Sequence, residues 1–485
     1  MAPELYRLTL PLLAYAVLVL SVGLLATRTA GRSPEDYFLA GRRLGLVVLF
    51  MALFGTNATA FIFVGIPGRA YHDGIGIFSV NAPIVALFTP LTFYLVGVPA
   101  RSMARRLGAV TPAELLAKRF GSPLVGLILF AAFTIYTLPY MVSAVVGAAL
   151  TLEGTTGGAV PAWLGGLCVV GVSLVYTALG GMRATAWTNV LQGVIFMGFL
   201  ILAFFLISTH MGGLESAMRA VEAHDPSLLK LERTGLFEPR QWISWGLLIS
   251  LTVIAFPHMF VRLMAADSAA TVKSVCRLYP LALLALWLPP VLIGVWGAVE
   301  FAGLEGKASD QIFQLMVDRH LPPLLAAGGL VAVLAAVMSS LDAMILTLSS
   351  MMVRDVLDRF RPARSERADV IAGRLFGFVV AAGVYLLARV WGRSVFDIAA
   401  VAFAGYVTLT PTLFLGVRWR RFTAAGAIAS ILVGTVVLHL GRAEILPVYG
   451  FLPVFWAFLA GLVAAIVVSL LTRPSDAART ARAFG

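Results

Sequence analysis

The stretch Leu44 to Tyr71, LGLVVLFMALFGTNATAFIFVGIPGRAY, decides how the rest of the chain is interpreted. It can cross a bilayer, for which about 20 apolar residues suffice, yet its centre is the small and polar run from Gly55 to Thr59. In hydrocarbon every backbone amide must be paired, so an interrupted helix survives only where it lines a protein-enclosed cavity, and its freed carbonyls can hold a cation there. On this segment alone, close packing of small residues at a helix contact is the simpler explanation.

The composition is that of a polytopic membrane protein. The chain is 60% hydrophobic with a mean hydropathy of +0.93 and 12% charged residues, against about 25% in soluble domains. Because apolar runs recur from end to end with short connectors, one membrane domain over residues 1–485 is expected. The net charge of +12 follows from membrane topology rather than from nucleic-acid binding, and Cys168 and Cys276 lack a metal-type spacing, which predicts neither a disulfide nor a metal cluster.

Apolar runs predict an all-α protein with about 13 transmembrane helices. A leading helix at 7–27 follows a single basic residue and is too long for a signal peptide. A cytoplasmic tail covers 473–485 and two C-terminal helices lie within 423–472. The helices after the leading one are expected at 44–68, 75–100, 123–150, 159–179, 184–209, 242–268, 278–300, 321–353, 370–390, 395–416, 423–440 and 450–472.

The basic residues predict the orientation. Connectors after alternate helices, with the C-terminal tail, hold about 24 of the 36 basic residues and are therefore cytoplasmic by the positive-inside rule. This places the N-terminus outside and the C-terminus inside, in a multi-pass plasma (inner) membrane protein, and the preference for Arg over Lys is typical of a GC-rich bacterium. The densest cytoplasmic connector carries Arg354, Arg359, Arg361, Arg364 and Arg367.

A five-helix unit repeats, first over 44–209 and again over 242–416, with matched helices offset by about 200 to 210 residues. Because five is odd, the second copy enters the membrane inverted. Its first helix, ISWGLLISLTVIAFPHMFVRLMAADS, is interrupted by Pro257 and His258, since proline removes a helical hydrogen bond. The interrupted helices at 44–68 and 242–268 are helices 1 and 6 of a five-plus-five inverted repeat. Discontinuous helices at these two equivalent positions mark a substrate and ion site, which favours binding over packing for Leu44 to Tyr71.

Five stretches together resemble the sodium:solute symporter family, which has the LeuT-like inverted-repeat fold. The resemblance runs from Ser33 to about Arg421 and is closer to the amino-acid, pantothenate and monocarboxylate members than to the sugar members. The stretches are SPEDYFLAGR (33–42), GTNATAFIFVGIPGRAYHDGIG (55–76), GGMRATAWTNVLQGVIFMG (180–198), AAVMSSLDAMILTLSSMMVRD (335–355) and AFAGYVTLTPTLFLGVRWRRFTAAGAIAS (402–430).

The resemblance implies a sodium ion between the helices at 44–68 and 321–353. The matching groups are the carbonyls of Gly55, Ala58 and Ala336 and the hydroxyls of Ser339 and Ser340. The spacing of the last three sets them on one helix face, and a hard cation prefers several oxygen ligands. The competing explanation is that the serines bond back to carbonyls of their own helix.

A second set of residues is assigned to ion coupling or to the family signature. Asn189 stands where many members carry an acid used for a second sodium or for ion release, so one sodium per cycle is expected. Asp342 is a deep intramembrane acid for which a structural hydrogen bond and ion coupling are both open, and Arg262 could pair with an acid, line the inner exit or snorkel. The full set is Thr188, Asn189, Gln192, His258, Arg262 and Asp342.

The expected function is sodium-coupled import of a small solute across the lipid bilayer. The FPHMFVR stretch and the anion-favouring helix break predict a carboxylate-bearing solute such as an amino acid, pantothenate or a monocarboxylate. A proton-coupled transporter of the same fold and a non-transporting receptor are the alternatives, and no facing nucleophile and base indicate an enzyme. The candidate substrate contacts are Asn57, Phe61, Tyr136, Tyr140, Ser250, Thr252, Phe256 and Tyr406.

Overall fold

The computed structural model describes residues 2–27, 34–231, 235–360, 365–390 and 392–485, so Arg361 and Arg364 of the basic connector lie outside the described residues. Within these ranges the regular structure is helical, apart from one parallel bridge between Leu44 and Ala266. The described residues contain ten helices long and apolar enough to span a membrane, or twelve spans when each of two bent helix pairs is counted as one. The expectation of an all-α polytopic membrane protein is therefore confirmed.

The long helices begin and end close to the expected positions. Proline opens several of them, at Pro123, Pro323 and Pro453, because its missing N–H costs nothing in a first helical turn. The helix over 76–107 continues through a π-helical turn, η3 (Phe93–Gly97). The elements are α1 (Ala2–Thr27), α5 (Gly76–Thr92), α6 (Val98–Leu107), α8 (Pro123–Thr155), α9 (Ala162–His210), α13 (Ala269–Glu300), α15 (Pro323–Met351), α17 (Glu366–Val390), α18 (Val395–Val407), α19 (Thr410–Arg418), α20 (Ala424–Arg442) and α21 (Pro453–Leu471).

Two spans are broken where the sequence predicted. The first consists of α3 (Leu46–Asn57), a π-helical turn η2 (Phe61–Gly65) and α4 (Ile66–Asp73), and its halves are bent by 49°. The second consists of α11 (Pro239–Ala255) and α12 (Pro257–Ala265), bent by 50°. Ala58 and Phe256 have extended backbone at the two breaks, so the carbonyls before them leave the helical ladder.

The count of twelve is one fewer than the predicted 13 because α9 is counted once, although it consists of two helices that join at a kink and correspond to the expected helices at 159–179 and 184–209. Gly181 lies inside it with φ 57° and ψ −149°, a conformation in which a side chain would be strained. A Cβ atom at Gly181 would also lie 2.5 Å from the carbonyl oxygen of Tyr37. The backbone of α9 can therefore kink against α2 (Pro34–Leu39) only with glycine at this position.

Short helices cover the ends of the bundle and were not expected, since the sequence count considered only runs long enough to cross a membrane. The residues 473–485, expected as a tail, contain the short helix α22, in which Arg479 Nη1 donates to the Phe120 carbonyl at 3.3 Å. The short elements are η1 (Ala40–Arg42), α7 (Pro112–Phe120), α10 (Leu214–His224), η4 (Pro226–Leu229), η5 (Gly235–Phe237), η6 (Gly306–Gln311), α14 (Ile312–His320), η7 (Met352–Leu357), α16 (Asp358–Phe360) and α22 (Ala477–Phe484).

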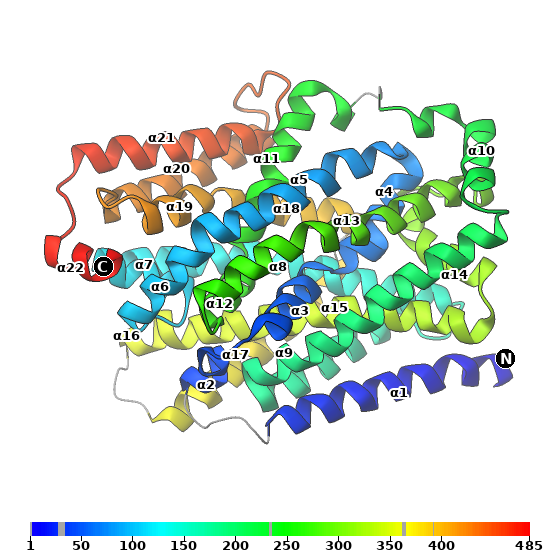
Figure 1. Cartoon of the computed structure of the whole chain (residues 1–485), viewed down its shortest axis with the longest axis horizontal. Coiled ribbons are helices and arrows are strands. Elements are labelled where there is room, and N and C mark those ends of the chain that lie inside the picture. The colour runs from blue at the N-terminus through cyan, green and yellow to red at the C-terminus, as the bar shows by residue number, and fades with distance from the viewer. Residues whose placement is uncertain (1, 28–33, 232–234, 361–364, 391) are drawn as a thin grey trace.

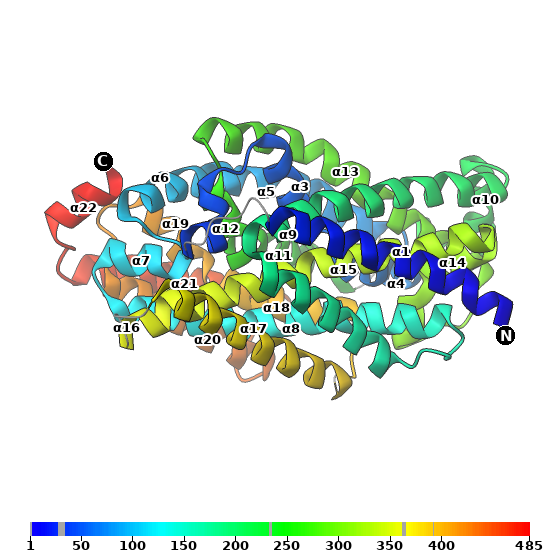
Figure 2. The same ribbon diagram turned by 90° about the horizontal axis from the view of Figure 1, so that it is seen from below.

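The bundle has two distinct ends, and the termini lie at opposite ones in both views (Figures 1 and 2). One end, at the right in Figure 1, carries the start of α1 with α10 and α14 and is called the α14 end. The other, at the left, carries α6, α7 and α22 and is called the α7 end. The core helix is α15, which is buried almost throughout its length and packs against α1, α8, α9 and α17.

Candidate functional site

The break in the first span lies directly against α15, and oxygen atoms of both elements gather there. Ser339 Oγ donates to the carbonyls of Gly55 and Ala336, each at 2.8 Å. Ser340 Oγ lies 3.4 Å from the carbonyl of Ala58 and 3.1 Å from that of Ala336. The five groups predicted to hold sodium are therefore brought together, and all five residues are buried.

A sixth oxygen was missed by the sequence reasoning. Ser340 Oγ also donates to the carbonyl of Thr56, at 3.0 Å. Thr56 lies inside the polar run, so its carbonyl could have been included, but the spacing alone does not say which carbonyls of a broken turn face the partner helix. Both serines bond across to the break as well as back along α15, so the helical back-bond and the inter-helix contact coexist.

The chemistry of this cluster suits a hard monovalent cation. Its ligands are neutral carbonyl and hydroxyl oxygens, and a hydroxyl that now donates to a carbonyl can rotate to offer a lone pair instead. No group of three or more His, Cys, Asp or Glu residues that could hold a metal occurs in the described ranges. A sodium ion would find several neutral oxygens at the cluster itself.

A small cavity of about 30 Å³ lies beside the helix breaks. Five of the eight predicted substrate contacts line it, namely Asn57, Phe61, Tyr140, Thr252 and Phe256. Solute pockets usually measure about 300 to 1,000 Å³, so side chains must move apart before a solute fits in this conformation. The cavity is bordered by both broken spans, which is where an inverted-repeat transporter binds its solute.

The other three predicted contacts are not among the lining residues. Tyr136 bonds through its hydroxyl to Thr435 Oγ1 at 2.9 Å, and Tyr406 donates to Thr137 Oγ1 at 2.6 Å. Ser250 Oγ donates back to the Gly246 carbonyl at 2.5 Å, within α11. Their hydroxyls are thus engaged in helix contacts in this conformation.

Two aromatic residues that the sequence reasoning missed complete the lining. Phe403 on α18 lies with its ring centroid 5.3 Å from Phe61, and its carbonyl accepts a hydrogen bond from Thr252 Oγ1 at 3.1 Å. Trp287 on α13 lies 6.1 Å from the same Phe61 ring. Phe403 is three residues before the predicted Tyr406 on one helix, whereas nothing in the sequence singled out α13.

The predicted coupling residues on α9 lie next to the sodium cluster. Asn189 Nδ2 donates to Thr56 Oγ1 at 3.2 Å and to the Ser339 carbonyl at 3.1 Å. Thr188 Oγ1 lies 3.5 Å from Asp342 Oδ2, at the limit of a hydrogen bond. Asn189 therefore contacts both helices that form the proposed ion site.

Arg262 and His258 lie on α12, just beyond the second break. Arg262 is 1% exposed, and its Nη1 donates to the Ala52 carbonyl on α3 at 2.5 Å. His258 is stacked on Phe256, and neither of its ring nitrogens has a hydrogen-bond partner among the described residues. Arg262 does not snorkel, because its guanidinium is buried against another helix.

The α7 end is closed by hydrogen bonds to backbone carbonyls at the end of α12. Leu44 N donates to the Ala265 carbonyl at 3.2 Å, joining the start of the first broken span to the end of the second. Arg101 Nε donates to the Ala266 carbonyl at 2.9 Å, and Arg105 Nη2 donates to the Asp267 carbonyl at 3.0 Å. Two basic residues of α6 therefore bind the backbone directly after α12, at the end of the second broken span.

The α14 end is covered by the connector that contains η6. Asp310 is 3% exposed, and its Oδ2 accepts a hydrogen bond from the Val395 amide at the start of α18, at 2.9 Å. A Cβ atom on Gly68 would lie 3.0 Å from Asp310 Oδ1, so the connector sits closely on α4. Burial raises the pKa of Asp310 to about 7, with the Val395 amide and Lys307 acting against this shift and Asp397 adding to it.

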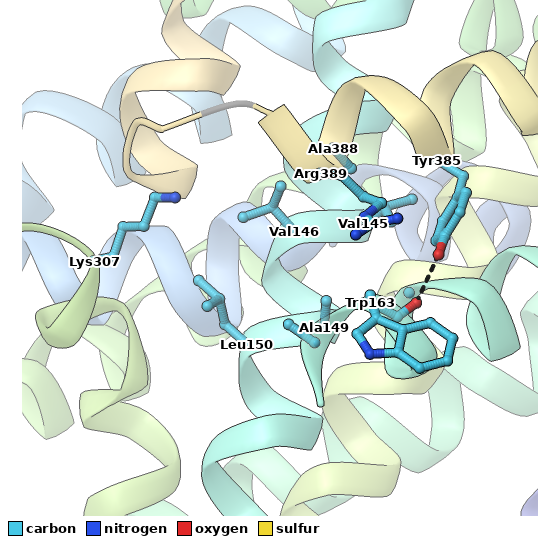
Figure 3. A pocket seen from close by; sticks show the side chains of 11 residues that line it. Val145, Val146, Ala149, Leu150, Trp163, Lys307, Tyr385, Ala388 and Arg389 are labelled. Carbon is cyan, nitrogen blue, oxygen red and sulfur yellow. Dashed lines mark hydrogen bonds between the residues drawn. The ribbon is translucent and has the colours of Figure 1, made fainter. Parts of the chain in front are cut away.

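A larger cavity of about 280 Å³ lies at the α14 end between α8, α9 and α17 (Figure 3). Lys307 and Arg389 border it from different elements, and the Tyr385 hydroxyl donates to the Trp163 carbonyl at 3.1 Å (Figure 3). None of the predicted sodium or substrate residues lines it. Size alone therefore does not identify the site, and the small cavity beside the helix breaks is the better candidate.

A helical membrane protein with two broken spans and a neutral oxygen cluster at one break has the construction of a secondary transporter. The model of the sodium:solute symporter family matches residues 37–434, and the chain belongs to this family. It is 28% identical to the sodium/pantothenate symporter of Escherichia coli (strain K12) over 469 residues, which cover 94% of this chain and 95% of that protein. It is also 28% identical to the high-affinity proline transporter PutP of Bacillus subtilis (strain 168), covering 91% and 94% of the two chains.

The fold is shared with solved structures. The substrate-bound outward-open state of a Na⁺-coupled sialic acid symporter superposes with a TM-score of 0.83 at 19% identity, covering 97% of this chain and 99% of that one. A nucleobase-cation-symport-1 family transporter, Mhp1, gives a TM-score of 0.59 at 16% identity over 93% of this chain and 98% of that one. At these identities the likeness establishes the fold, and the family membership establishes a symporter rather than an enzyme.

Proposed function

We propose that this sodium:solute symporter moves one sodium ion with one small carboxylate-bearing solute, an amino acid, pantothenate or a monocarboxylate, by alternating access. The observation that carries the proposal is the contact of Ser339 and Ser340 with the carbonyls of the α3 break. Sodium bound there would hold α3 against α15 beside the cavity that takes the solute. Ion binding and solute binding would thus favour the same arrangement of the two helices, which is the basis of coupled transport.

The lining of the small cavity supports a solute with one apolar part and a small polar part. The rings of Phe61, Phe256, Phe403 and Trp287 offer apolar and π contacts, and Thr252 offers a hydroxyl. No charged side chain lines it. A carboxylate would instead be held by the free amides at the start of α12, where the helix dipole favours an anion.

The orientation and the internal symmetry are further parts of the proposal. Basic residues are numerous at the α7 end, on η1, α6, α7 and α16, which supports a cytoplasmic location for that end. The N-terminus would then be outside and the C-terminus inside. The matching breaks at Ala58 and Phe256 support a five-plus-five inverted repeat, with α9 crossing the membrane twice about Gly181 for 13 crossings in all.

Transport into proteoliposomes tests the proposal. Purified protein is reconstituted, and uptake of radiolabelled L-proline, pantothenate, lactate and glucose is measured with an inward sodium gradient, with a potassium gradient, and with a proton gradient alone. The expected result is saturable uptake of a carboxylate that requires the sodium gradient. Saturable glucose uptake without any carboxylate uptake would refute the solute class, and uptake driven by protons alone would refute the ion.

A matched pair of variants ties uptake to the cavity. Thr252→Val keeps the shape of the side chain and removes the hydroxyl beside the cavity, and the solute KM should rise about 2- to 10-fold, the usual loss for one hydrogen bond. Thr209→Val, at the exposed end of α9, removes a hydroxyl that donates to the Phe205 carbonyl of its own helix and should leave KM unchanged. If both variants have the same KM, the solute does not bind beside Thr252.

A further inference from the structure

The cavity of about 280 Å³ at the α14 end lies where helices reach the boundary of the membrane. Its lining residues on α9 follow the first residue of that helix, Ala162, and those on α17 precede the last, Val390. Membrane-spanning helices begin and end near the lipid head groups, so the cavity lies at head-group depth. Trp163 and Tyr385, which are joined by a hydrogen bond of 3.1 Å, are the residue types enriched at membrane interfaces.

The lining combines aliphatic side chains with two cations. Lys307 of η6 and Arg389 of α17 bring positive charge from two elements, and Figure 3 shows them at different sides of the cavity. None of the described residues that line it is acidic, and Glu153 nearby in the chain accepts a hydrogen bond from the Ala162 amide at 3.2 Å instead. The lining therefore complements a molecule with an anionic head and a hydrocarbon part. The aliphatic residues, all on α8, are Val145, Val146, Ala149 and Leu150.

The position of the cavity favours a lipid over a soluble anion. It lies between α8, α9 and α17, and none of the described residues of the two broken spans lines it, so it is separate from the solute cavity. Beside it, α9 and α17 present large apolar side chains outward, because Leu167 is 45% exposed, Leu386 61% and Val390 78%. Such a surface faces lipid chains in a membrane protein. A phospholipid next to these helices can place its head group in the cavity while its chains stay in the bilayer.

We propose that this cavity binds the head group of an anionic phospholipid from the leaflet at the α14 end, with Lys307 and Arg389 recognising its negative charge. Lysine and arginine near a membrane surface attract anionic lipids, and the aliphatic side chains of α8 would contact the first part of the acyl chains. Lys307 belongs to η6, whose Asp310 accepts a hydrogen bond from the Val395 amide at 2.9 Å. The bound lipid would therefore contact the segment that covers the α14 end. The site goes beyond the proposed function, since it involves neither the solute nor sodium.

The test is binding of phosphatidylglycerol to the purified, delipidated full chain, measured by native mass spectrometry over a range of lipid concentrations. Phosphatidylcholine with the same acyl chains tests the role of the negative charge. Glycerol 3-phosphate tests whether a soluble anion with a similar phosphate group binds equally well. The wild type should bind phosphatidylglycerol about 30-fold more tightly than phosphatidylcholine, as expected for two cations near a membrane surface, and excess glycerol 3-phosphate should not displace it.

Variants tie this binding to the cavity. Lys307→Gln and Arg389→Gln should each weaken phosphatidylglycerol binding about 5-fold, and the double variant about 30-fold, because each cation contributes separately. Ala388→Phe keeps both cations but fills part of the cavity, so it should weaken phosphatidylglycerol binding as well. The control is Arg219→Gln, which removes an exposed cation of α10 that pairs with Glu215 at the same end of the bundle (Figure 1). It should bind phosphatidylglycerol as the wild type does.

Three results would overturn the proposal. Equal binding of phosphatidylglycerol and phosphatidylcholine would show that the charge of the head group is not recognised. Displacement by glycerol 3-phosphate would identify a site for soluble anions rather than for a lipid. Wild-type binding by the double variant Lys307→Gln/Arg389→Gln would place the lipid elsewhere on the protein. If the double variant fails to fold, Arg389→Lys and Ala388→Phe decide, because the first keeps the charge and should bind as the wild type, whereas the second should bind more weakly; equal binding by these two would also overturn the proposal.

Discussion

Removing a single hydroxyl from α15 should weaken sodium binding without altering the solute cavity. Ser340 Oγ lies within 3.4 Å of the carbonyls of Thr56, Ala58 and Ala336, and Ser339 Oγ lies 2.8 Å from the Gly55 carbonyl. Each serine would supply one of about five oxygens to the ion. The carbonyls cannot be deleted by changing a side chain, so Ser339→Ala and Ser340→Ala are the direct perturbations.

The magnitude follows from the burial of the site. Both serines are 0% exposed, so water cannot readily replace the lost oxygen. A buried polar partner left without its counterpart costs about 1 to 3 kcal/mol, which corresponds to roughly a 5- to 150-fold increase in the sodium concentration for half-maximal uptake. Solute affinity at saturating sodium should change much less, because the loss reaches the solute only through linkage between the two sites.

The assay is initial uptake into proteoliposomes over a range of external sodium concentrations at fixed membrane potential. Ser349→Ala is the matched control, since Ser349 lies further along the same helix and its hydroxyl donates to the Ile345 carbonyl of that helix, at 2.7 Å. It should retain the wild-type sodium dependence. If all three variants share the wild-type value, the ion does not bind at these oxygens, and Asp342 becomes the next residue to test.

Two further predictions concern the closed ends of the bundle. Burial raises the pKa of Asp310 from its ordinary 3.8 to about 7, so the folded protein favours the protonated acid at this position. The contribution of the protonated acid to folding stability should be fully present below about pH 3.8 and be lost as the pH rises to about 7. Asp310→Asn keeps an amide oxygen that can accept from the Val395 amide, and it should remove that part of the pH dependence of the melting temperature. Gly294→Ala would place a Cβ atom 2.3 Å from the Pro67 carbonyl oxygen and should lower the free energy of unfolding by about 1 to 3 kcal/mol. The control is Gly383→Ala, whose Cβ atom would have nothing within 4 Å and should leave the free energy of unfolding unchanged. Equal melting temperatures for the two variants would contradict the close packing of α13 on α4.

Much of the architecture could be predicted from local features of the sequence. Proline at position 257 cannot donate to the helical ladder, and the run from Gly55 to Thr59 is too small and polar for an uninterrupted lipid-facing helix, so both breaks were visible. The spacing of Ala336, Ser339 and Ser340 placed three oxygens on one face of α15. These inferences depend on neighbours within one or two helical turns, which is the range over which a sequence pattern fixes geometry.

The kink of α9 shows where this reasoning stops. The sequence predicted two helices with a connector near residue 180, and α9 does consist of two helices, which join directly at the kink at Gly181. Only glycine fits at this joint, because its φ is 57° and a Cβ atom would lie 2.5 Å from the Tyr37 carbonyl oxygen of α2. That contact joins residues 144 positions apart in the chain, so no local pattern could reveal it.

From the amino-acid sequence alone follow the helical membrane architecture, the positions at which two spans break, and the serines that share one side of α15. The packed fold was needed to show which carbonyls those serines meet, that Arg262 bonds to Ala52 rather than reaching the membrane surface, and that Tyr136 bonds to Thr435 instead of lining the cavity. Helical periodicity fixes the face on which a side chain lies, whereas the partner of that face depends on how helices distant in sequence cross and pack.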